Sequence, residues 1–169
     1  MARKATRTRH ARRTRTVRER PGSHATGGTS VAGIQYIESS ALLAALIEGD
    51  PGVRSLLKQD ARRIASALTF AECKRALVRG VLTGRLSAND EGNAVRALDA
   101  IAEDCAVVPI STEILQRAGR RFPVEPVRTL DAIHLATLEL LGLPRDKVVV
   151  LSGDRRIREN AERLGYAVV

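Results

Sequence analysis

The stretch IQYIESSALL, residues 34–43, is typical of a short apolar strand that runs directly into an apolar helix. Glu38 is its one charged residue and stands at the junction between the strand and the helix. A carboxylate at the edge of a core is costly unless it caps a helix, pairs with another group or binds a ligand. The position of Glu38 therefore raises the question of which of these roles it has.

The same alternation of short apolar runs and longer helical patterns continues to the end of the chain. The expected strands are 34–37, 63–67, 105–110, 148–151 and 166–169. The expected helices are 40–48, 51–59, 69–84, 87–104, 111–122, 128–142 and 154–165. Continuous apolar strands that alternate with helices are typical of a parallel sheet covered on both faces. We therefore expect an α/β fold with three layers and a mostly parallel central sheet of about five strands.

Charge divides the chain into two parts. Its 169 residues include 28 Lys and Arg against 19 Asp and Glu, a formal net charge of +9. Nine of the basic side chains and only one acid fall within residues 1–33, so residues 34–169 are nearly neutral. We interpret 1–33 as a disordered basic tail, because it has no apolar periodicity, and 34–169 as the folded domain. Three interpretations of the tail stay open: a phosphate-binding arm, a transit peptide, or sequence upstream of the true translation start.

Hydropathy and cysteine spacing exclude several classes of protein. No run approaches the roughly 18 to 20 uninterrupted apolar residues that span a bilayer, so we expect a soluble, cytoplasmic protein with no membrane partner. Cys73 and Cys105 form neither a CxxC pair nor a Cys/His ligand spacing, so neither a zinc site nor a disulfide framework is expected. Cys73 points about 100° away from Glu72 around a helix, and we expect it in the core.

Four carboxylates follow strands or begin helices. They are Glu38 after the first strand, Glu72 in the first turn of helix 69–84, Asp131 at the start of helix 128–142 and Asp154 after strand 148–151. If the strands are parallel, all four lie near the edge of the sheet where such folds bind ligands. Together they would repel one another without a cation, and their oxygen ligands suit Mg²⁺ or Mn²⁺.

Each of these acids also has a purely structural explanation. Thr69 and Glu72 fit a capping box, in which Thr69 is the N-cap of the helix. Asp131 and Asp154 suit helix N-termini, and Glu38 can be a solvated strand end. Taken singly, each acid fits its structural role, and only the four together predict a metal site.

Four segments of the folded part resemble the PIN-domain ribonucleases, and among them the VapC-type toxins of bacterial toxin–antitoxin pairs. The segments are IQYIESSALLAAL (34–46), SALTFAECKRAL (66–77), RTLDAIHLATLELLG (128–142) and VVVLSGDRRIRENAERLGYAVV (148–169). The resemblance covers residues 34–169, and TFAE and DAIHLAT in this order and spacing are specific in combination. It implies a flavodoxin-like PIN domain and a Mg²⁺- or Mn²⁺-dependent endoribonuclease that hydrolyses RNA phosphodiester bonds with a metal-bound water. It also implies a homodimer inhibited by a cognate antitoxin that fills the acidic groove.

The resemblance assigns the site position by position. The catalytic and metal-binding acids of the family fall on Glu38, Glu72, Asp131 and Asp154, and the supporting hydroxyls on Ser39 or Ser40 and on Ser152. The basic side chains that could hold the RNA backbone are Arg75, Arg79, Arg155 and Arg156. We expect His134, one turn after Asp131, to be packed or hydrogen-bonded rather than a general base.

The first acid is typically Asp in this family, whereas this chain has Glu38. The extra methylene moves the carboxylate outward by about 1.5 Å, although Mg²⁺ demands near-ideal octahedral geometry. This departure motivates a second hypothesis, a catalytically weakened PIN-like protein that binds RNA or a partner. A third, a phosphohydrolase with a nucleophilic Asp, is disfavoured because no Asp-x-Asp follows the first strand.

Overall fold

The structure is a computed structural model and describes residues 33–169. The predicted boundary of the basic tail falls at 33, and residues 1–32 lie outside the described part, so the interpretation of the tail stays a prediction. Within residues 33–169, seven α-helices surround a five-stranded sheet in which every strand pairing is parallel. The predicted α/β fold is therefore confirmed. No helix in this part of the chain is long and apolar enough to cross a membrane.

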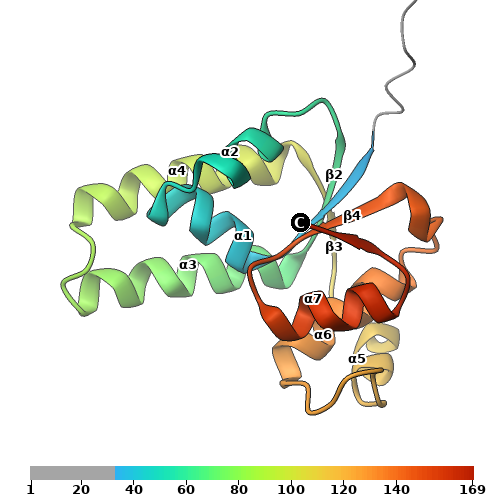
Figure 1. Cartoon of the computed structure of the whole chain (residues 1–169). Helices are drawn as coiled ribbons and strands as arrows, with labels where there is room; N and C mark the ends of the chain where they lie inside the picture. Colours follow the sequence, from blue (N-terminus) through green and yellow to red (C-terminus); the bar gives the residue numbers. More distant parts are fainter. Residues whose placement is uncertain (1–32) are drawn as a thin grey trace, which may run out of the picture.

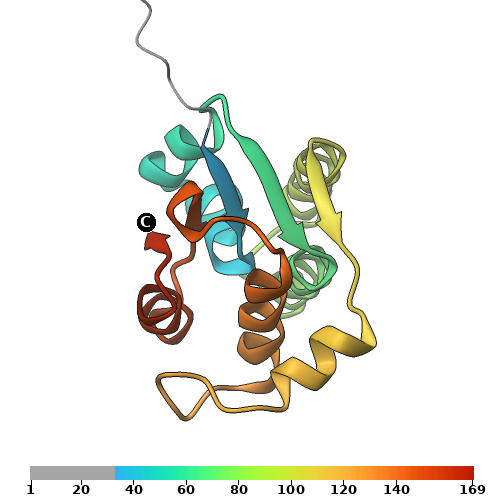
Figure 2. The ribbon, with the colours of Figure 1, turned by 90° about the vertical axis from the view of Figure 1, so that its right-hand side faces the viewer.

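The order of the strands places the first and fourth strands next to each other in the middle of the sheet. The strands are β1 (Ile34–Ile37), β2 (Arg62–Ser66), β3 (Cys105–Val108), β4 (Val148–Leu151) and β5 (Ala167–Val168). They lie in the order β3-β2-β1-β4-β5, and Figure 2 shows β3, β2 and β1 side by side. The chain winds outward in opposite directions from β1 and from β4, and parallel sheets bind ligands where the order reverses in this way.

The helices form a layer on each face of the sheet (Figure 1). One layer contains α1 (Ser39–Leu43), the π-helical turn η1 (Ala44–Glu48), α2 (Pro51–Leu57), α3 (Ala67–Leu82) and α4 (Ala88–Glu103). The other contains α5 (Thr112–Ala118), α6 (Thr129–Leu140) and α7 (Arg155–Arg163), and the short 3-10 helix η2 (Arg145–Lys147) leads into β4. The fold therefore has the three layers that the sequence predicts.

Alternation along β1 divides the core between these layers, because successive strand side chains point to opposite faces. Tyr36 packs with Leu138 of α6 and with Val150 of β4. Ile37, the next residue, packs with Leu42 of α1 on the other face. All of these side chains are buried, so both helical layers pack against β1.

The start of α3 differs from the prediction, and the Thr69–Glu72 capping box is wrong. Ser66 is the N-cap, and its hydroxyl accepts a hydrogen bond from the Leu68 amide at 3.2 Å. Thr69 lies within the helix, buried, and its hydroxyl donates to the Ile37 carbonyl at 3.2 Å. Glu72 consequently lies in the second turn of α3 and not in the first.

Several other elements are shorter than predicted. Strand 105–110 ends at Val108, because Pro109 has no amide hydrogen with which to continue a ladder. Strand 166–169 keeps only the two residues of β5, helix 111–122 ends at Ala118, and helix 40–48 divides into α1 and η1. These differences leave the predicted order of elements unchanged.

Candidate active site

Glu38 lies where β1 ends and α1 begins, and it is only 4% exposed. It is the N-cap of α1, because its carboxylate accepts a hydrogen bond from the Ser40 amide at 3.1 Å. Its own amide donates to the Leu151 carbonyl at 3.0 Å and extends the pairing of β1 with β4. The explanation of Glu38 as a solvated strand end is therefore wrong.

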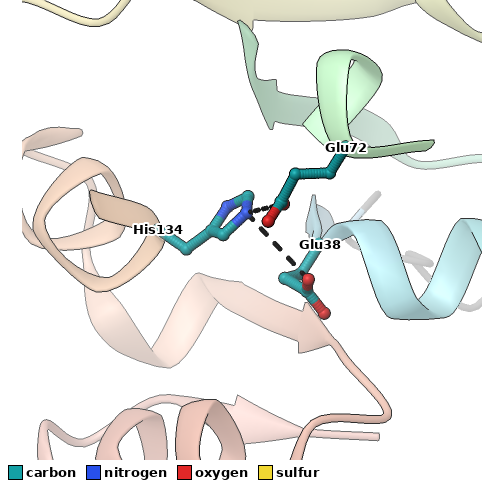
Figure 3. Close-up of side chains that lie close together, drawn as sticks. All are labelled: Glu38, Glu72 and His134. Carbon is teal, nitrogen blue, oxygen red and sulfur yellow. Dashed lines mark hydrogen bonds and ion pairs between the residues drawn. The ribbon is translucent and has the colours of Figure 1, made fainter. Parts of the chain in front are cut away.

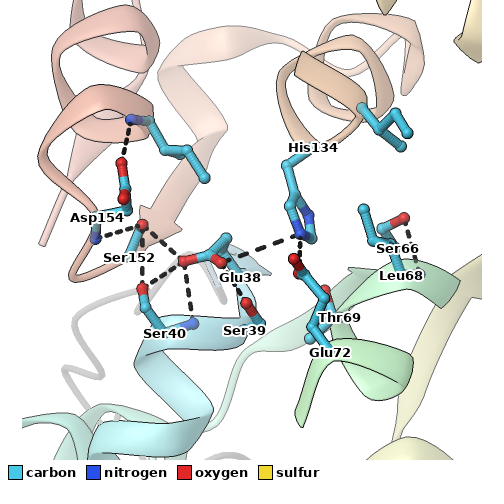
Figure 4. Close-up of polar contacts among 12 residues, drawn as sticks. Glu38, Ser39, Ser40, Ser66, Leu68, Thr69, Glu72, His134, Ser152 and Asp154 are labelled. Atoms are coloured by element: carbon cyan, nitrogen blue, oxygen red, sulfur yellow. Dashed lines mark hydrogen bonds and ion pairs between the residues drawn. The ribbon is translucent and has the colours of Figure 1, made fainter. Parts of the chain in front are cut away.

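Three hydroxyl groups surround this carboxylate (Figure 4). Ser39 Oγ donates to Glu38 Oε1 at 2.5 Å, and Ser152 Oγ donates to Oε2 at 2.8 Å. Ser40 Oγ also donates to Oε2 and accepts a hydrogen bond from the Gly153 amide at 2.8 Å. Ser152 follows β4, so the segments that leave the two central strands meet at Glu38. All three hydroxyls predicted to support the site contact its first acid.

Glu72 and His134 complete a compact group with Glu38 (Figure 3). His134 Nε2 lies 2.7 Å from Glu72 Oε2 and 4.0 Å from Glu38 Oε1. One potential ligand atom from each of these residues lies within 4.8 Å of the others. We call Glu38, Glu72 and His134 the inner cluster. It joins β1, α3 and α6, which are far apart in the sequence.

His134 is only 1% exposed and is hydrogen-bonded through both ring nitrogens. Nε2 contacts Glu72, and Nδ1 lies 3.3 Å from the hydroxyl of Tyr36, which is also buried. The Tyr36 hydroxyl lies 3.2 Å from the His134 carbonyl as well. The expectation of a packed, hydrogen-bonded histidine is therefore confirmed, although its contact with Glu72 was not foreseen.

The surroundings of Glu72 favour its charged form. Burial alone raises the pKa of this carboxyl, but the hydrogen bond and the charge of His134 and the Ser39 hydroxyl outweigh burial. The pKa of Glu72 therefore lies below its ordinary value. With 24% of its side chain exposed, Glu72 is the member of the inner cluster that solvent reaches most easily.

The other two predicted acids lie in an adjoining hollow of about 400 Å³, which we call the outer pocket. Its lining residues are Pro126, Val127, Arg128, Asp131, Asp154, Arg155 and Arg156. Asp154 is the N-cap of α7 and accepts hydrogen bonds from the Arg156 amide at 2.7 Å and the Ile157 amide at 3.0 Å. The helix-capping explanation of Asp154 is confirmed. Asp131 lies in the first turn of α6, as predicted.

Negative charge accumulates around Asp131. Burial, the charge of Asp154 and the charge of Glu38 raise the pKa of Asp131, against the opposing effect of Arg128. Because Asp131 and His134 are three residues apart in α6, they lie on one face of that helix. Ser152 makes a second connection, since its hydroxyl donates to Glu38 and accepts from the Asp154 amide at 3.1 Å. The four acids therefore converge in one region, as two joined groups.

The predicted arginines divide between two places. Arg155 and Arg156 line the outer pocket, whereas Arg75 and Arg79 lie exposed on α3. Arg79 lines a different hollow, between α3 and η1. Arg128, which was not predicted from the sequence, also lines the outer pocket. Its position three residues before Asp131, where α6 begins, was the available signal.

Asn160 is a second residue that the sequence did not reveal. It is buried on α7, accepts a hydrogen bond from the Val124 amide at 2.9 Å and donates to the Val124 carbonyl at 2.9 Å. Arg156 Nη1 donates to the Glu125 carbonyl at 3.2 Å in the same loop. These contacts attach the loop that carries Pro126 and Val127 to α7, and so fix the rim of the outer pocket.

Cys73 and a second hollow do not belong to the candidate active site. Cys73 is fully buried, and burial together with the charges of Glu38 and Glu72 raises the pKa of its thiol to about 12, so the expected core role is confirmed. A larger hollow of about 770 Å³ lies between η1, α2 and α4, and none of the four predicted acids lines it.

The chain is similar to known proteins in sequence and in fold. The PIN domain family matches residues 36–163. Ribonuclease VapC46 of Mycobacterium tuberculosis is 33% identical over 138 residues, which cover 79% of this chain and 95% of that protein. Two solved structures share the fold. PAE2754 from Pyrobaculum aerophilum has a TM-score of 0.56 and 20% identity, over 81% of this chain and 83% of that one. A toxin–antitoxin complex from Klebsiella pneumoniae has a TM-score of 0.51 and 15% identity, over 80% and 95% of the two chains.

Proposed function

Because this chain belongs to the PIN domain family, we propose that it is a metal-dependent endoribonuclease and the toxin of a toxin–antitoxin pair. VapC46, which shares a third of its residues with this chain over nearly its whole length, is a ribonuclease by name. The observation that carries the proposal is the inner cluster, in which two carboxylates, one directly after β1 and one in α3, face one another at the carboxyl end of the sheet.

The donor set of the inner cluster fits a divalent cation. Glu38 and Glu72 supply oxygen atoms, which Mg²⁺ and Mn²⁺ both accept, and Asp131 adds negative charge at the boundary with the outer pocket. These three residues would hold the ion, and Asp154 would contribute from its position at the start of α7. When bound, such an ion lowers the pKa of a coordinated water and neutralises charge that develops on a phosphate.

The residues around the cluster prepare it for that role. The serine hydroxyls and the Ser40 amide hold the Glu38 carboxylate in one orientation, so little reorganisation is needed when a cation binds. The lowered pKa of Glu72 keeps it ionised over a wide pH range. In the outer pocket, Arg128, Arg155 and Arg156 would hold RNA phosphates beside the reacting bond. With only 2% aromatic residues, recognition should depend on phosphate contacts and RNA shape more than on base stacking.

The proposed function also specifies partners and a location. An antitoxin partner is supported by the toxin–antitoxin complex among the structural neighbours. The candidate active site of this chain is acidic. The simplest inhibitor is therefore a basic side chain of the antitoxin, inserted toward Glu72 and Asp131. We further propose a homodimer, in keeping with the family resemblance, and a cytoplasmic protein, because RNA and a newly made antitoxin are found there.

A second candidate is favoured by one observation at Glu38. Both of its carboxylate oxygens already accept hydrogen bonds, and Oε2 accepts three of them. A carboxylate so fully engaged has little capacity left for a cation. The second candidate is therefore a catalytically weakened PIN protein that binds RNA or the antitoxin without turnover.

One experiment separates the two candidates. Purified full-length protein is incubated with structured RNAs and Mg²⁺ or Mn²⁺, beside the Asp131→Asn and Glu38→Asp variants. The endoribonuclease cleaves RNA as the wild type, and cleavage is lost with excess chelator and in Asp131→Asn. Cleavage that survives the chelator contradicts a metal-dependent enzyme. Cleavage by Glu38→Asp alone supports the weakened protein instead.

A further inference from the structure

Three side chains form a continuous hydrogen-bonded chain from the core to the candidate metal site. Tyr36 belongs to β1, His134 to α6 and Glu72 to α3, so the chain connects the sheet with both helical layers (Figure 3 shows its outer half). The Tyr36 hydroxyl lies 3.3 Å from His134 Nδ1, and His134 Nε2 lies 2.7 Å from Glu72 Oε2. The first two side chains are buried and the third reaches partly into solvent.

The donors and acceptors of this chain can be assigned from its chemistry. The Tyr36 hydroxyl lies within hydrogen-bond distance of both His134 Nδ1 and the His134 carbonyl. The Tyr36 hydroxyl donates to the His134 carbonyl, and it is the one contact of Nδ1 among the described residues. Because an ionised carboxylate can only accept hydrogen bonds, His134 Nε2 carries the hydrogen of its contact with Glu72 and donates it. Every polar atom of the ring then has a partner.

We propose that His134 is a positioning residue, which with Tyr36 behind it holds Glu72 toward Glu38 in the orientation that a cation requires. This inference rests on the proposed function of the inner cluster. Glu72 projects from the second turn of α3 with three rotatable side-chain bonds, and of the serine hydroxyls that fix Glu38 only that of Ser39 also acts on it. His134 engages Oε2 and leaves Oε1 of Glu72 available for the ion.

Affinity for Mn²⁺, measured on the full-length protein by the EPR signal of free Mn²⁺, tests this role without RNA. His134→Leu removes both ring nitrogens, and we expect Mn²⁺ affinity to fall by roughly 10- to 100-fold, as is usual when a partner of a metal ligand is lost. His134→Gln keeps an N–H donor at about the reach of Nε2 and should restore most of the affinity. Tyr36→Phe removes only the hydroxyl and should have an intermediate effect.

Two controls separate positioning from a general loss of folding. Tyr166→Phe removes another buried hydroxyl, which donates to the Leu138 carbonyl and does not contact the inner cluster, and it should leave Mn²⁺ affinity unchanged. In a Glu72→Gln background, His134→Leu should cause no further loss of affinity, because the group that it positions is already altered. Equal losses from His134→Leu in both backgrounds would overturn the proposal.

The spectrum of bound Mn²⁺ separates positioning from direct ligation. A positioning histidine gives no directly bonded nitrogen coupling in pulsed EPR, whereas a ligand gives a coupling that disappears in His134→Gln. The second result would overturn the inference and make His134 a ligand. Unchanged Mn²⁺ affinity in His134→Leu would overturn only the inference, and a wild type that neither binds Mn²⁺ nor cleaves RNA would overturn the proposed function as well.

Discussion

The inner cluster and the outer pocket lie side by side at the carboxyl end of the sheet, and each contains two predicted acids. They differ in what surrounds those acids. Glu38 and Glu72 face hydroxyls, an amide and an imidazole, and Glu38 is almost completely buried. Asp131 and Asp154 share an open hollow with three arginines.

This difference gives the two regions different ligands. Hydroxyl and amide donors fix a carboxylate without cancelling its charge, so the inner cluster keeps a negative potential in a confined space, which favours a cation. In the outer pocket the arginines outnumber the aspartates, and guanidinium groups suit phosphate. We therefore assign the metal to the inner cluster and the RNA backbone to the outer pocket.

The largest effect is expected from Glu72→Gln in the inner cluster. The change keeps the size of the side chain but removes the charge, so RNA cleavage should fall by roughly a thousandfold or more, equal to a loss of several kcal/mol of metal-based stabilisation. Cleavage rates and Mn²⁺ binding are measured on the same preparations. Glu103→Gln, an exposed glutamate at the end of α4, is the matched control and should behave as the wild type. Nearly normal cleavage by Glu72→Gln would remove the inner cluster from the mechanism.

A smaller and different effect is expected in the outer pocket. The double variant Arg128→Gln and Arg156→Gln should weaken RNA binding by about tenfold and reduce the slope of log affinity against log salt by roughly 0.7 for each lost phosphate contact. Mn²⁺ affinity should change little. Arg163→Gln, an exposed arginine at the opposite end of α7, serves as the control. If the double variant leaves the salt slope unchanged, the outer pocket does not hold the RNA backbone.

The smallest effect concerns stability. Because the folded protein raises the pKa of Asp131, its ionised form is less favourable folded than unfolded. At pH 7 and without metal, Asp131→Asn should therefore increase the free energy of unfolding slightly, by about a few tenths of a kcal/mol, because solvent screens a partly exposed charge. Urea unfolding from pH 7 to pH 4 should show this advantage shrinking as the pH falls through the raised pKa toward the ordinary value of Asp. A constant advantage across that range would mean that charge is not its cause.

Much of the fold could be predicted because its strands are buried on both faces. The runs at 34–37 and 148–151 are continuous and apolar, and the structure has strands at these positions with the same bounds. The start of α3 could not be predicted in the same way, because Ser66 and Thr69 are both capable N-caps. Which of the two residues caps the helix depends on the Ile37 carbonyl of β1, which accepts the hydrogen bond of the Thr69 hydroxyl.

The candidate site was predictable in position more than in detail. Parallel strands bring their carboxyl ends together, which is why Glu38 and Ser152 could be placed near each other from the sequence alone. The contact between His134 and Glu72 depends on the rotation of α6 relative to α3 and on two rotamers, which no local pattern encodes. Whether the four acids act as catalytic residues stays a prediction.

The position of a bound ion tests most directly whether the inner cluster is a metal site. Crystals of the full-length protein soaked in Mn²⁺ would locate it by anomalous diffraction, which identifies the metal independently of activity. We expect one peak within coordination distance of Glu38 and Glu72, at roughly 2.0 to 2.3 Å from their oxygens. A peak held only by Asp131 and Asp154 in the outer pocket, or no peak in protein that cleaves RNA, would contradict this expectation.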